Sequence, residues 1–286
     1  MNVENEQKVQ KRRIDWKSIL VIFILLAILG AGWGFRSMNN NWDESRHLHP
    51  DERYLSMVVN MIEPVWTARE YFDTAASPLN PANKDFSFFV YGTLPLFMLR
   101  YAGEWTGQTG YDLNTLLGRT MSAAMDTLTI LLIFLTAKKL FNRWIGLIAA
   151  ALYAFAVLPI QLAHYMTVDS FTNTFAMLTV LIAAEILMRK PLSAEEESGK
   201  VIRIWKEIWP YLAFGAALGM ATASKINAVS LALLLPLVEG VRYFRQEDEG
   251  NEPSLRRIIG KIGLAAIVSI VVFRVFQPYA FDGPGF

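Results

Sequence analysis

The feature that most limits how this chain can fold is a series of long segments with few or no charged residues. They cover approximately residues 18–35, 86–102, 114–137, 144–162, 170–188, 208–223, 226–241 and 262–278. A helix needs roughly twenty apolar residues to cross the hydrocarbon core of a bilayer. Because 53% of the 286 residues are hydrophobic and only 19% are charged, a single water-soluble core cannot hide the apolar surface. The sequence therefore predicts an all-α polytopic membrane protein.

Net charge and cysteine content exclude several classes of function. The chain has 27 basic and 26 acidic residues and a net charge of +1, so a nucleic-acid partner has no electrostatic support. It has no cysteine, which excludes disulfides, cysteine-ligated metals and thiol nucleophiles.

The positions of the basic residues predict how the helices are oriented. Several lysines and arginines precede the first span, and cytoplasmic loops carry an excess of such residues, so we expect a cytoplasmic N-terminus. The basic cluster at 138–143 must then be cytoplasmic too, which requires that either 86–102 or 114–137 does not cross. The run 86–102 is short and contains Gly92 and Pro95, so we assign it as an interfacial or re-entrant helix.

This assignment gives seven crossings. We expect a basic cytoplasmic tail over 1–17, a transmembrane core over 18–278 with an external loop over 36–113, and an external tail over 279–286. An alternative with eight crossings places basic residues on the wrong side of the membrane. The short loops and the lack of an organellar signal favour a prokaryotic plasma membrane.

An acid pair in the external loop is the strongest candidate for chemistry. Asp51 and Glu52 follow His49-Pro50, and proline is typical of the first position of a helix. The helix dipole favours negative charge in the first turn, so capping is the alternative role of the pair. The apolar residues that follow have helical spacing: Leu55, Val58, Val59 and Ile62. We therefore expect this helix to lie along the membrane, apolar face down, with both carboxylates at the level of the headgroups.

Two charged residues lie inside the second predicted span or at its start. Arg119 and Asp126 are seven residues apart and share a helix face. Charges within spans usually face a bundle interior or a cavity, so an internal structural ion pair is one interpretation. The other is a transporter or channel in which Arg119, Asp126 and Arg274 line a substrate path. The absence of a visible repeat and the long external loop with its acid pair weigh against a transporter. An inactive scaffold or half-enzyme is a third reading.

Four further polar residues lie near the external ends of the spans. His164 and Asp169 flank a short turn, where a single histidine is more often a hydrogen-bonded structural residue than a ligand. Lys225 follows one span, and Arg274 lies about one turn before the end of the last. Either cation can merely extend to the membrane interface.

Five segments together resemble the GT-C superfamily of polytopic, lipid-carrier-dependent glycosyltransferases. They read HPDER, FSFFVYGTLPLF, GRTMSAAMDTLTILLIFLTAKKLF, HYMTVDSFTNTFAML and GMATASKINAVSLALLLPL. The resemblance is strongest to the protein O-mannosyltransferase and aminoarabinose-transferase-like branch and covers roughly residues 18–280. It implies a seven-span module whose first external loop carries juxtamembrane helices and the catalytic acid. Because relatives continue past the seventh span, we expect this chain to be a fragment that stops at Phe286.

Carried over residue by residue, the resemblance implies that Asp51 is the catalytic base of the acid pair Asp51-Glu52. The family's arginine at the start of the second span matches Arg119, and its lysine before the sixth span matches Lys225. Its LLDS-like turn matches residues 167–170, which include Asp169. Asp126 stands where relatives usually have a small residue.

The resulting expectation is a glycosyltransferase that moves a sugar from a polyprenyl-phosphate donor to an acceptor hydroxyl on the external face. Asp51 would take the proton of the acceptor. The expected ligands of the donor phosphate are Lys225, Arg119 and Arg274. The residues expected to orient sugar or acceptor, or to bind a divalent cation if one is used, are Glu52, His164 and Asp169. The sugar, the acceptor (protein, lipid or glycan) and the need for a metal stay open.

Overall fold

The computed structural model describes residues 16–189, 200–248 and 254–281, and these residues form helices joined by turns and loops. The helices of the main bundle are α1 (Trp16–Ser37), α5 (Tyr111–Leu140), α6 (Arg143–Ala154), α7 (Val157–Ala163), α8 (Val168–Met188), α9 (Lys200–Ser224), α10 (Leu234–Asp248) and α11 (Leu255–Phe276). The α-helices outside this bundle are α2 (Pro50–Met61), α3 (Ala68–Tyr71) and α4 (Thr93–Thr106). The 3-10 helices are η1 (Pro81–Lys84), η2 (Ile226–Leu233) and η3 (Pro278–Ala280).

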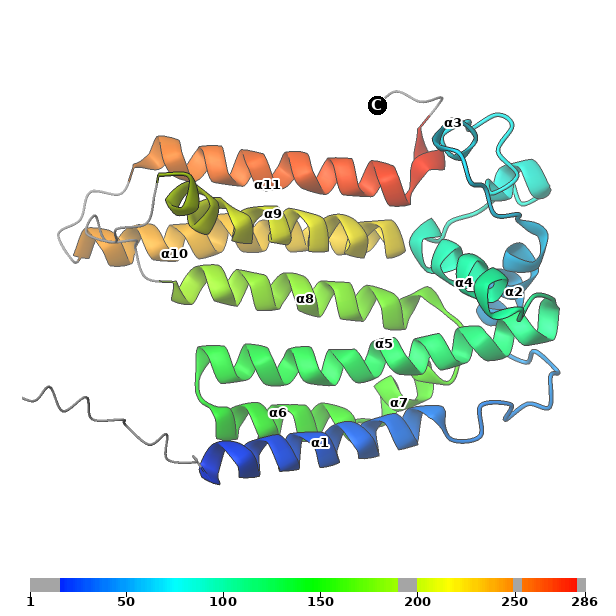
Figure 1. Ribbon diagram of the computed structural model, residues 1–286, viewed down its shortest axis with the longest axis horizontal. Helices are drawn as coiled ribbons and strands as arrows, with labels where there is room; N and C mark the ends of the chain where they lie inside the picture. Colours follow the sequence, from blue (N-terminus) through cyan, green and yellow to red (C-terminus); the bar gives the residue numbers. More distant parts are fainter. Residues whose placement is uncertain (1–15, 190–199, 249–253, 282–286) are drawn as a thin grey trace, which may run out of the picture.

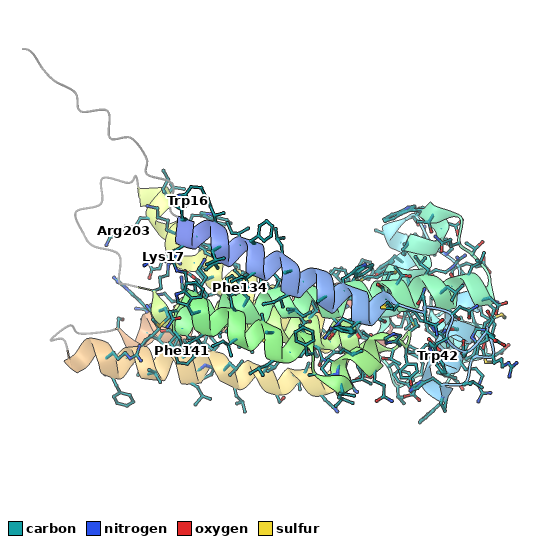
Figure 2. All side chains as sticks on the ribbon, turned by 90° about the horizontal axis from the view of Figure 1, so that it is seen from below. Trp16, Lys17, Trp42, Phe134, Phe141 and Arg203 are labelled. Atoms are coloured by element: carbon teal, nitrogen blue, oxygen red, sulfur yellow. The ribbon has the colours of Figure 1, made fainter. Side chains whose placement is uncertain are left out.

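The long helices run along one common direction, and α2, α3 and α4 gather at one end of them (Figure 1). We call this end the loop end, because it also carries the connections of residues 38–92. The α5–α6 connection lies at the opposite end, which we call the basic end. Figure 2 shows Lys17 and Arg203 at the basic end and Trp42 at the loop end. The cytoplasmic side of the bundle stays a prediction.

Five segments in the described part of the chain are long and apolar enough to cross a membrane. They are α1, α5, α8, α11 and the stretch Ile226–Arg245, which consists of η2 and most of α10. The pair α6 and α7, bent by 59°, makes a sixth if it forms one broken span. α9 lies between α8 and α11 in the bundle and packs against both. The all-α polytopic membrane fold is confirmed, whereas the number of seven crossings stays a prediction.

The close contact of α9 with α11 depends on two glycines. A Cβ on Gly215 would lie 2.3 Å from the Ala265 carbonyl oxygen, and one on Gly219 would lie 2.7 Å from the Ser269 carbonyl oxygen. Small residues four apart let two backbones approach in this way. This contact holds the end of α9 against α11.

The run 86–102 does not form one long helix. α4 begins only at Thr93, with Gly92 as its N-cap, and ends before Gly107, which has a positive φ of 68°. Its 14 residues lie at the loop end rather than along the bundle, and α4 is not among the candidate spans. This agrees with the assignment of 86–102 as a segment that does not cross.

The apolar face of α2 is covered by protein rather than by lipid. Leu55, Val58, Val59 and Ile62 have no exposed surface. They form one core with residues of α4 and of the turn before α8, which include Leu96, Leu99 and Met166. The expectation that this face lies down on the bilayer is therefore wrong, because α4 folds back over α2 and buries it first. Burial in this core fixes the start of α2 relative to the bundle.

Candidate functional site

The start of α2 places its two acids in different surroundings. His49 is the N-cap, and its Nδ1 accepts a hydrogen bond of 3.3 Å from the Glu52 amide. Its ring stacks on Tyr165 with 4.2 Å between centroids, so the start of α2 is tied to the turn before α8. Asp51 is exposed, whereas Glu52 is completely buried. Consecutive helical residues point in different directions, which explains the difference.

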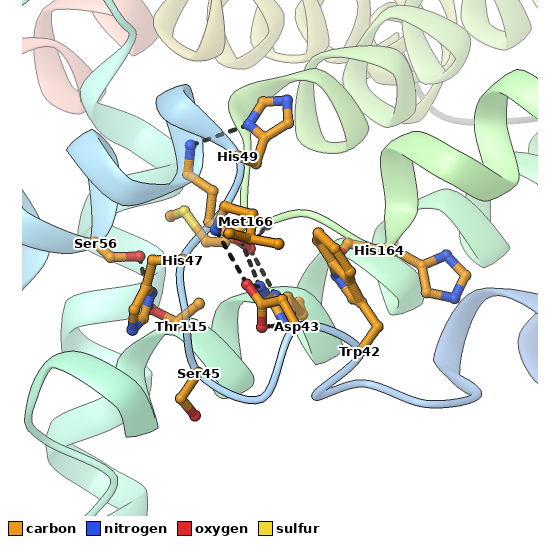
Figure 3. Close-up of polar contacts among 12 residues, drawn as sticks. Trp42, Asp43, Ser45, His47, His49, Ser56, Thr115, His164 and Met166 are labelled. Atoms are coloured by element: carbon orange, nitrogen blue, oxygen red, sulfur yellow. Dashed lines mark hydrogen bonds and ion pairs between the residues drawn. The ribbon is translucent and has the colours of Figure 1, made fainter.

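Glu52 belongs to a buried ion network whose centre is Arg119. The guanidinium donates through Nε and Nη2 to the two carboxylate oxygens of Glu52, at 2.8 and 2.6 Å. Through Nη1 and Nη2 it donates to the two oxygens of Asp43, at 3.0 and 2.9 Å. Nη1 also donates to the Asn40 carbonyl at 2.9 Å, and the Met166 amide donates to Glu52 at 2.7 Å. Figure 3 shows Asp43 and Met166 on either side of this network. Four separate segments therefore meet at Arg119.

Electrostatics favour the charged form of this network. Hydrogen bonding by Arg119 lowers the pKa of Asp43, although burial acts in the opposite direction. The Trp42 ring lies 5.3 Å from the guanidinium carbon and covers it from one side. A buried arginine with two carboxylates is stable only with such complete hydrogen bonding.

A second group of contacts fastens α2 to α5. The Thr115 hydroxyl donates to the Ser56 hydroxyl at 2.8 Å, and both side chains are buried. Nε2 of His47 lies 2.7 Å from an oxygen of Asp112, and its Nδ1 lies 3.4 Å from Thr115 (Figure 3). These contacts keep the first turns of α2 in register with α5.

The interpretation of Arg119 and Asp126 as an ion pair with each other is wrong. Asp126 accepts instead from Nε of Arg36, at 2.6 Å, and from the Tyr153 hydroxyl, at 2.6 Å. Seven helical residues correspond to a rise of about 10 Å, which is too far for direct contact between the two side chains. Each residue therefore pairs with a segment that is remote in the sequence.

Asp169 and Lys225 form an ion pair near the exposed part of the loop end. Nζ of Lys225 lies 2.7 Å from Oδ1 of Asp169, and both side chains are partly exposed. Asp169 stands in the first turn of α8, where the helix dipole favours its charge, and Lys225 follows directly after α9. An incoming anion can reach this lysine, because the pair is not closed off from solvent.

The segment before α4 brings Tyr91 to these groups. The Gly92 amide donates to the Ser224 carbonyl at 3.2 Å, and a Cβ on Gly92 would lie 2.1 Å from a backbone oxygen of α9, so only glycine fits. Burial and the negative charge of the nearby Asp51 carboxylate raise the pKa of the Tyr91 phenol. The charge of Asp169 contributes in the same direction. Asp51, Tyr91 and Asp169 are therefore neighbours.

Arg274 also lies at the loop end, but aromatic rings surround it. Its Nη1 donates to the Pro278 carbonyl at 2.9 Å. Its guanidinium carbon lies 4.9 Å from the Phe72 ring and 5.0 Å from the Phe281 ring. The side chain is buried, and these contacts join α11 to the segment around α3.

His164 joins the end of α7 to the loop after α1. Its Nδ1 lies 2.8 Å from the Ile160 carbonyl and its Nε2 lies 3.1 Å from the Met38 carbonyl. In Figure 3 its ring points away from Asp43 and Met166. This placement favours the structural interpretation of His164 over the orienting one.

The structure thus separates the predicted site residues into two sets. Asp169 and Lys225 form a partly exposed pair, and Asp169 and the exposed Asp51 both lie near Tyr91, whereas Glu52 and Arg119 are buried. Sequence reasoning missed Tyr91, Asp43 and Arg36. Tyr91 lies within the segment FSFFVYGTLPLF, but no spacing rule singles it out. Arg36 could have been found from the sequence, because a charge in the last turn of the first span needs a buried partner and Asp126 can provide it.

No group of three or more His, Asp or Glu side chains within residues 16–189, 200–248 and 254–281 can hold a metal ion. The sequence did not predict a divalent cation, so this observation decides nothing about metal dependence.

Comparison with known families identifies the chain. The model of the dolichyl-phosphate-mannose-protein mannosyltransferase family matches residues 89–248, which is more than half of the sequence. The chain belongs to this family. Its predicted place among the GT-C glycosyltransferases that use polyprenyl-phosphate sugars is thereby confirmed. No curated protein and no solved structure matches the chain.

The matched region contains most of the candidate site. Tyr91, Arg119, Asp169 and Lys225 lie within it, whereas Asp51 lies before its start. The mannosyltransferase match therefore covers the groups that surround Asp51, and the acid itself is connected to them by the contacts described above.

Proposed function

We propose that this chain transfers a sugar from a polyprenyl-phosphate donor to an acceptor hydroxyl, with Asp51 as the general base. The observation that carries the proposal is the placement of an exposed carboxylate beside the Asp169–Lys225 pair at one end of a membrane bundle. The name of the family supports mannose as the sugar and a protein as the acceptor. The excess of basic residues at the opposite end supports an external position for the site and a cytoplasmic N-terminus. The plasma membrane stays an expectation from the sequence.

The reaction requires a base at the acceptor oxygen and a cation at the leaving phosphate. The acceptor oxygen forms a bond to the anomeric carbon, and its proton goes to Asp51. The bond between that carbon and the phosphate oxygen breaks, and the phosphate leaves with the electron pair and extra negative charge. A fixed cation beside the leaving phosphate stabilises this charge in the transition state.

Lys225 suits the role of that cation. An ammonium group has three hydrogen-bond donors, and the contact with Asp169 uses one of them. Its partial exposure leaves the other donors accessible to a phosphate oxygen. Asp169 then holds the ammonium group in place while the donor is absent.

Arg119 suits a positioning role better than a phosphate-binding role. A guanidinium has five N–H donors, and Arg119 makes five hydrogen bonds to Glu52, Asp43 and the Asn40 carbonyl. A phosphate would have to displace a buried carboxylate. We therefore assign Arg119 and Glu52 to holding the start of α2, and with it Asp51, against the bundle.

Arg274 and His164 have the same kind of role in this proposal. The contacts of Arg274 with Phe72 and Phe281 hold α11 to the loop end, and those of His164 hold the loop after α1. The rival transporter needs Arg119 and Asp126 along a substrate path. Their hydrogen bonds to other protein groups weigh against it.

A donor panel tests the proposal. Purified chain is incubated with short-chain polyprenyl-phosphate sugars, including mannose, and with a serine- and threonine-containing peptide, and product formation is followed. We expect transfer, with a donor KM about tenfold higher in Lys225→Ala, because one charge-assisted hydrogen bond to phosphate is lost. Lys84→Ala, which removes a lysine paired with Glu63 elsewhere in the same loop region, should leave KM unchanged.

Two outcomes would contradict the proposal. One is the absence of transfer combined with uptake of an unmodified solute into vesicles that contain the chain, which is the result expected of a transporter. The other is transfer with an unchanged donor KM in Lys225→Ala, which would remove the lysine from the phosphate site.

A further inference from the structure

We propose that Tyr91 is a positioning residue for Asp51, and this inference rests on the proposed function. Its hydroxyl donates to one oxygen of the Asp51 carboxylate, which fixes the rotation of the carboxylate and leaves the other oxygen to receive the proton of the acceptor. The argument has three parts: the backbone around Tyr91 is fixed, its ring is fixed, and the charges around it keep the hydroxyl a donor.

The backbone next to Tyr91 is fixed by a contact between two distant segments. Gly92 lies directly against the end of α9, where its amide bonds the Ser224 carbonyl and no Cβ can be accommodated. On its other side, the Thr93 amide donates to the Gln277 side chain at 2.6 Å. Residues after α11 and at the end of α9 therefore determine where Tyr91 enters the site.

The ring of Tyr91 is held by other aromatic rings. Its centroid lies 6.1 Å from that of Tyr54 and 5.9 Å from that of Phe89. Tyr54 follows Asp51 by three residues, so both lie on the same side of α2. The Tyr54 hydroxyl donates to the Phe88 carbonyl at 2.9 Å, which holds residues 86–91 over this side of the helix.

The charges that face Tyr91 keep its hydroxyl protonated. Asp51 and Tyr54 face it from α2, and Asp169 faces it from α8. Lys225 forms an ion pair with this Asp169. A phenol is protonated at neutral pH, and burial and the two negative carboxylates raise its pKa further, so the hydroxyl is a hydrogen-bond donor and not a base. A donor facing a carboxylate in a packed site is the arrangement that fixes a general base.

Two substitutions at Tyr91 test this role, because a packing role and a hydrogen-bonding role predict opposite orders of kcat for Tyr91→Phe and Tyr91→His. Phe keeps the ring but cannot donate, whereas His has a smaller ring that can donate. We expect Tyr91→Phe to lower kcat for transfer about tenfold, with donor KM changed less than twofold and the melting temperature unchanged. Tyr91→His should recover part of the lost kcat. The control is Tyr71→Phe, which removes a hydroxyl that donates to the Val275 backbone at the same end, and it should leave kcat unchanged.

The remaining outcomes separate this inference from the function on which it rests. Equal kcat in Tyr91→Phe and wild type overturns the positioning role, as does a higher kcat in Tyr91→Phe than in Tyr91→His. If either result accompanies an inactive Asp51→Asn, only the Tyr91 inference fails. If Asp51→Asn is fully active, the proposed function itself fails, whatever Tyr91→Phe does.

Discussion

Arg36 and Arg119 are both almost completely buried, but they stabilise different parts of the protein. Arg36 pairs with one carboxylate, Asp126, and its other donors go to the carbonyls of Gly32, Tyr153 and Ala154. Arg119 instead pairs with two carboxylates from a loop and from α2. The first arginine joins helices within the bundle, and the second joins the loop end to it. Only the second lies next to a candidate catalytic residue.

The helix break explains why Arg36 is needed. α6 ends at Ala154 and α7 begins at Val157 after a bend of 59°, so the regular hydrogen bonding of a continuous helix is interrupted, although the Tyr153 carbonyl still accepts from the Ala156 amide at 3.2 Å. Backbone carbonyls at such a break are costly in a membrane unless another group satisfies them. Arg36 donates to the carbonyls of Tyr153 and Ala154, and the charge of Asp126 balances the guanidinium. This network is a structural device with no exposed acid beside it.

The largest effect should come from Arg119→Met. It leaves Asp43 and Glu52 as unpaired buried carboxylates, which costs about 3–5 kcal/mol. It should also lower kcat of the folded fraction about 10²-fold, since α2 and Asp51 move out of place. Melting in detergent and transfer assays on the folded fraction measure the two effects. An unchanged kcat would mean that the Arg119 network has no part in positioning Asp51.

Asp126→Asn should have a smaller and purely structural effect. The amide can still accept one hydrogen bond, but Arg36 loses its counter-charge, so we expect a loss of about 1–3 kcal/mol. Transfer by the folded fraction should stay within twofold of wild type. A large loss of kcat without a loss of stability would abolish the distinction between the two networks.

The smallest effect concerns pH. Because Arg119 lowers the pKa of Asp43, the unfolded chain binds more protons at this residue than the folded chain, and stability rises with pH in that range. The contribution is complete above the usual value of 3.8 and is lost as pH falls below it. Melting temperatures of wild type and Asp43→Asn between pH 3 and pH 6 measure it. We expect the difference between them to shrink toward pH 3, and a difference that does not change with pH would contradict this.

The elements of the bundle could be predicted from the sequence, because a membrane-spanning helix needs only a long apolar run. The break in the apolar run 144–162 could also have been predicted, because the run contains a proline. Pro159 lacks an amide donor and its ring would clash with the Phe155 carbonyl in a continuous helix, so the chain starts a new helix in which Pro159 lies in the first turn. The burial of α2 could not be foreseen, because its apolar spacing fits a lipid surface and the face of α4 equally well.

The candidate site could be predicted only in part. Asp51, Asp169 and Lys225 were singled out by their positions near the external ends of the spans and then by the resemblance. The structure pairs Lys225 with Asp169 and places Asp51 and Asp169 near Tyr91. The partners of Arg119 could not be found, because Glu52 and Asp43 are 67 and 76 residues away from it and no local spacing connects them. Tyr91 was missed for a similar reason, since its position depends on the contact of Gly92 with α9.

The most direct test of the central claim is kcat for transfer by Asp51→Asn, measured beside Asp85→Asn. Asp85 is an exposed acid of the same loop with a left-handed backbone that asparagine tolerates, so it controls for the chemical change. If Asp51 is the general base, Asp51→Asn lowers kcat by about 10²–10⁴-fold while Asp85→Asn stays within twofold. Transfer at the wild-type rate by Asp51→Asn would contradict the account.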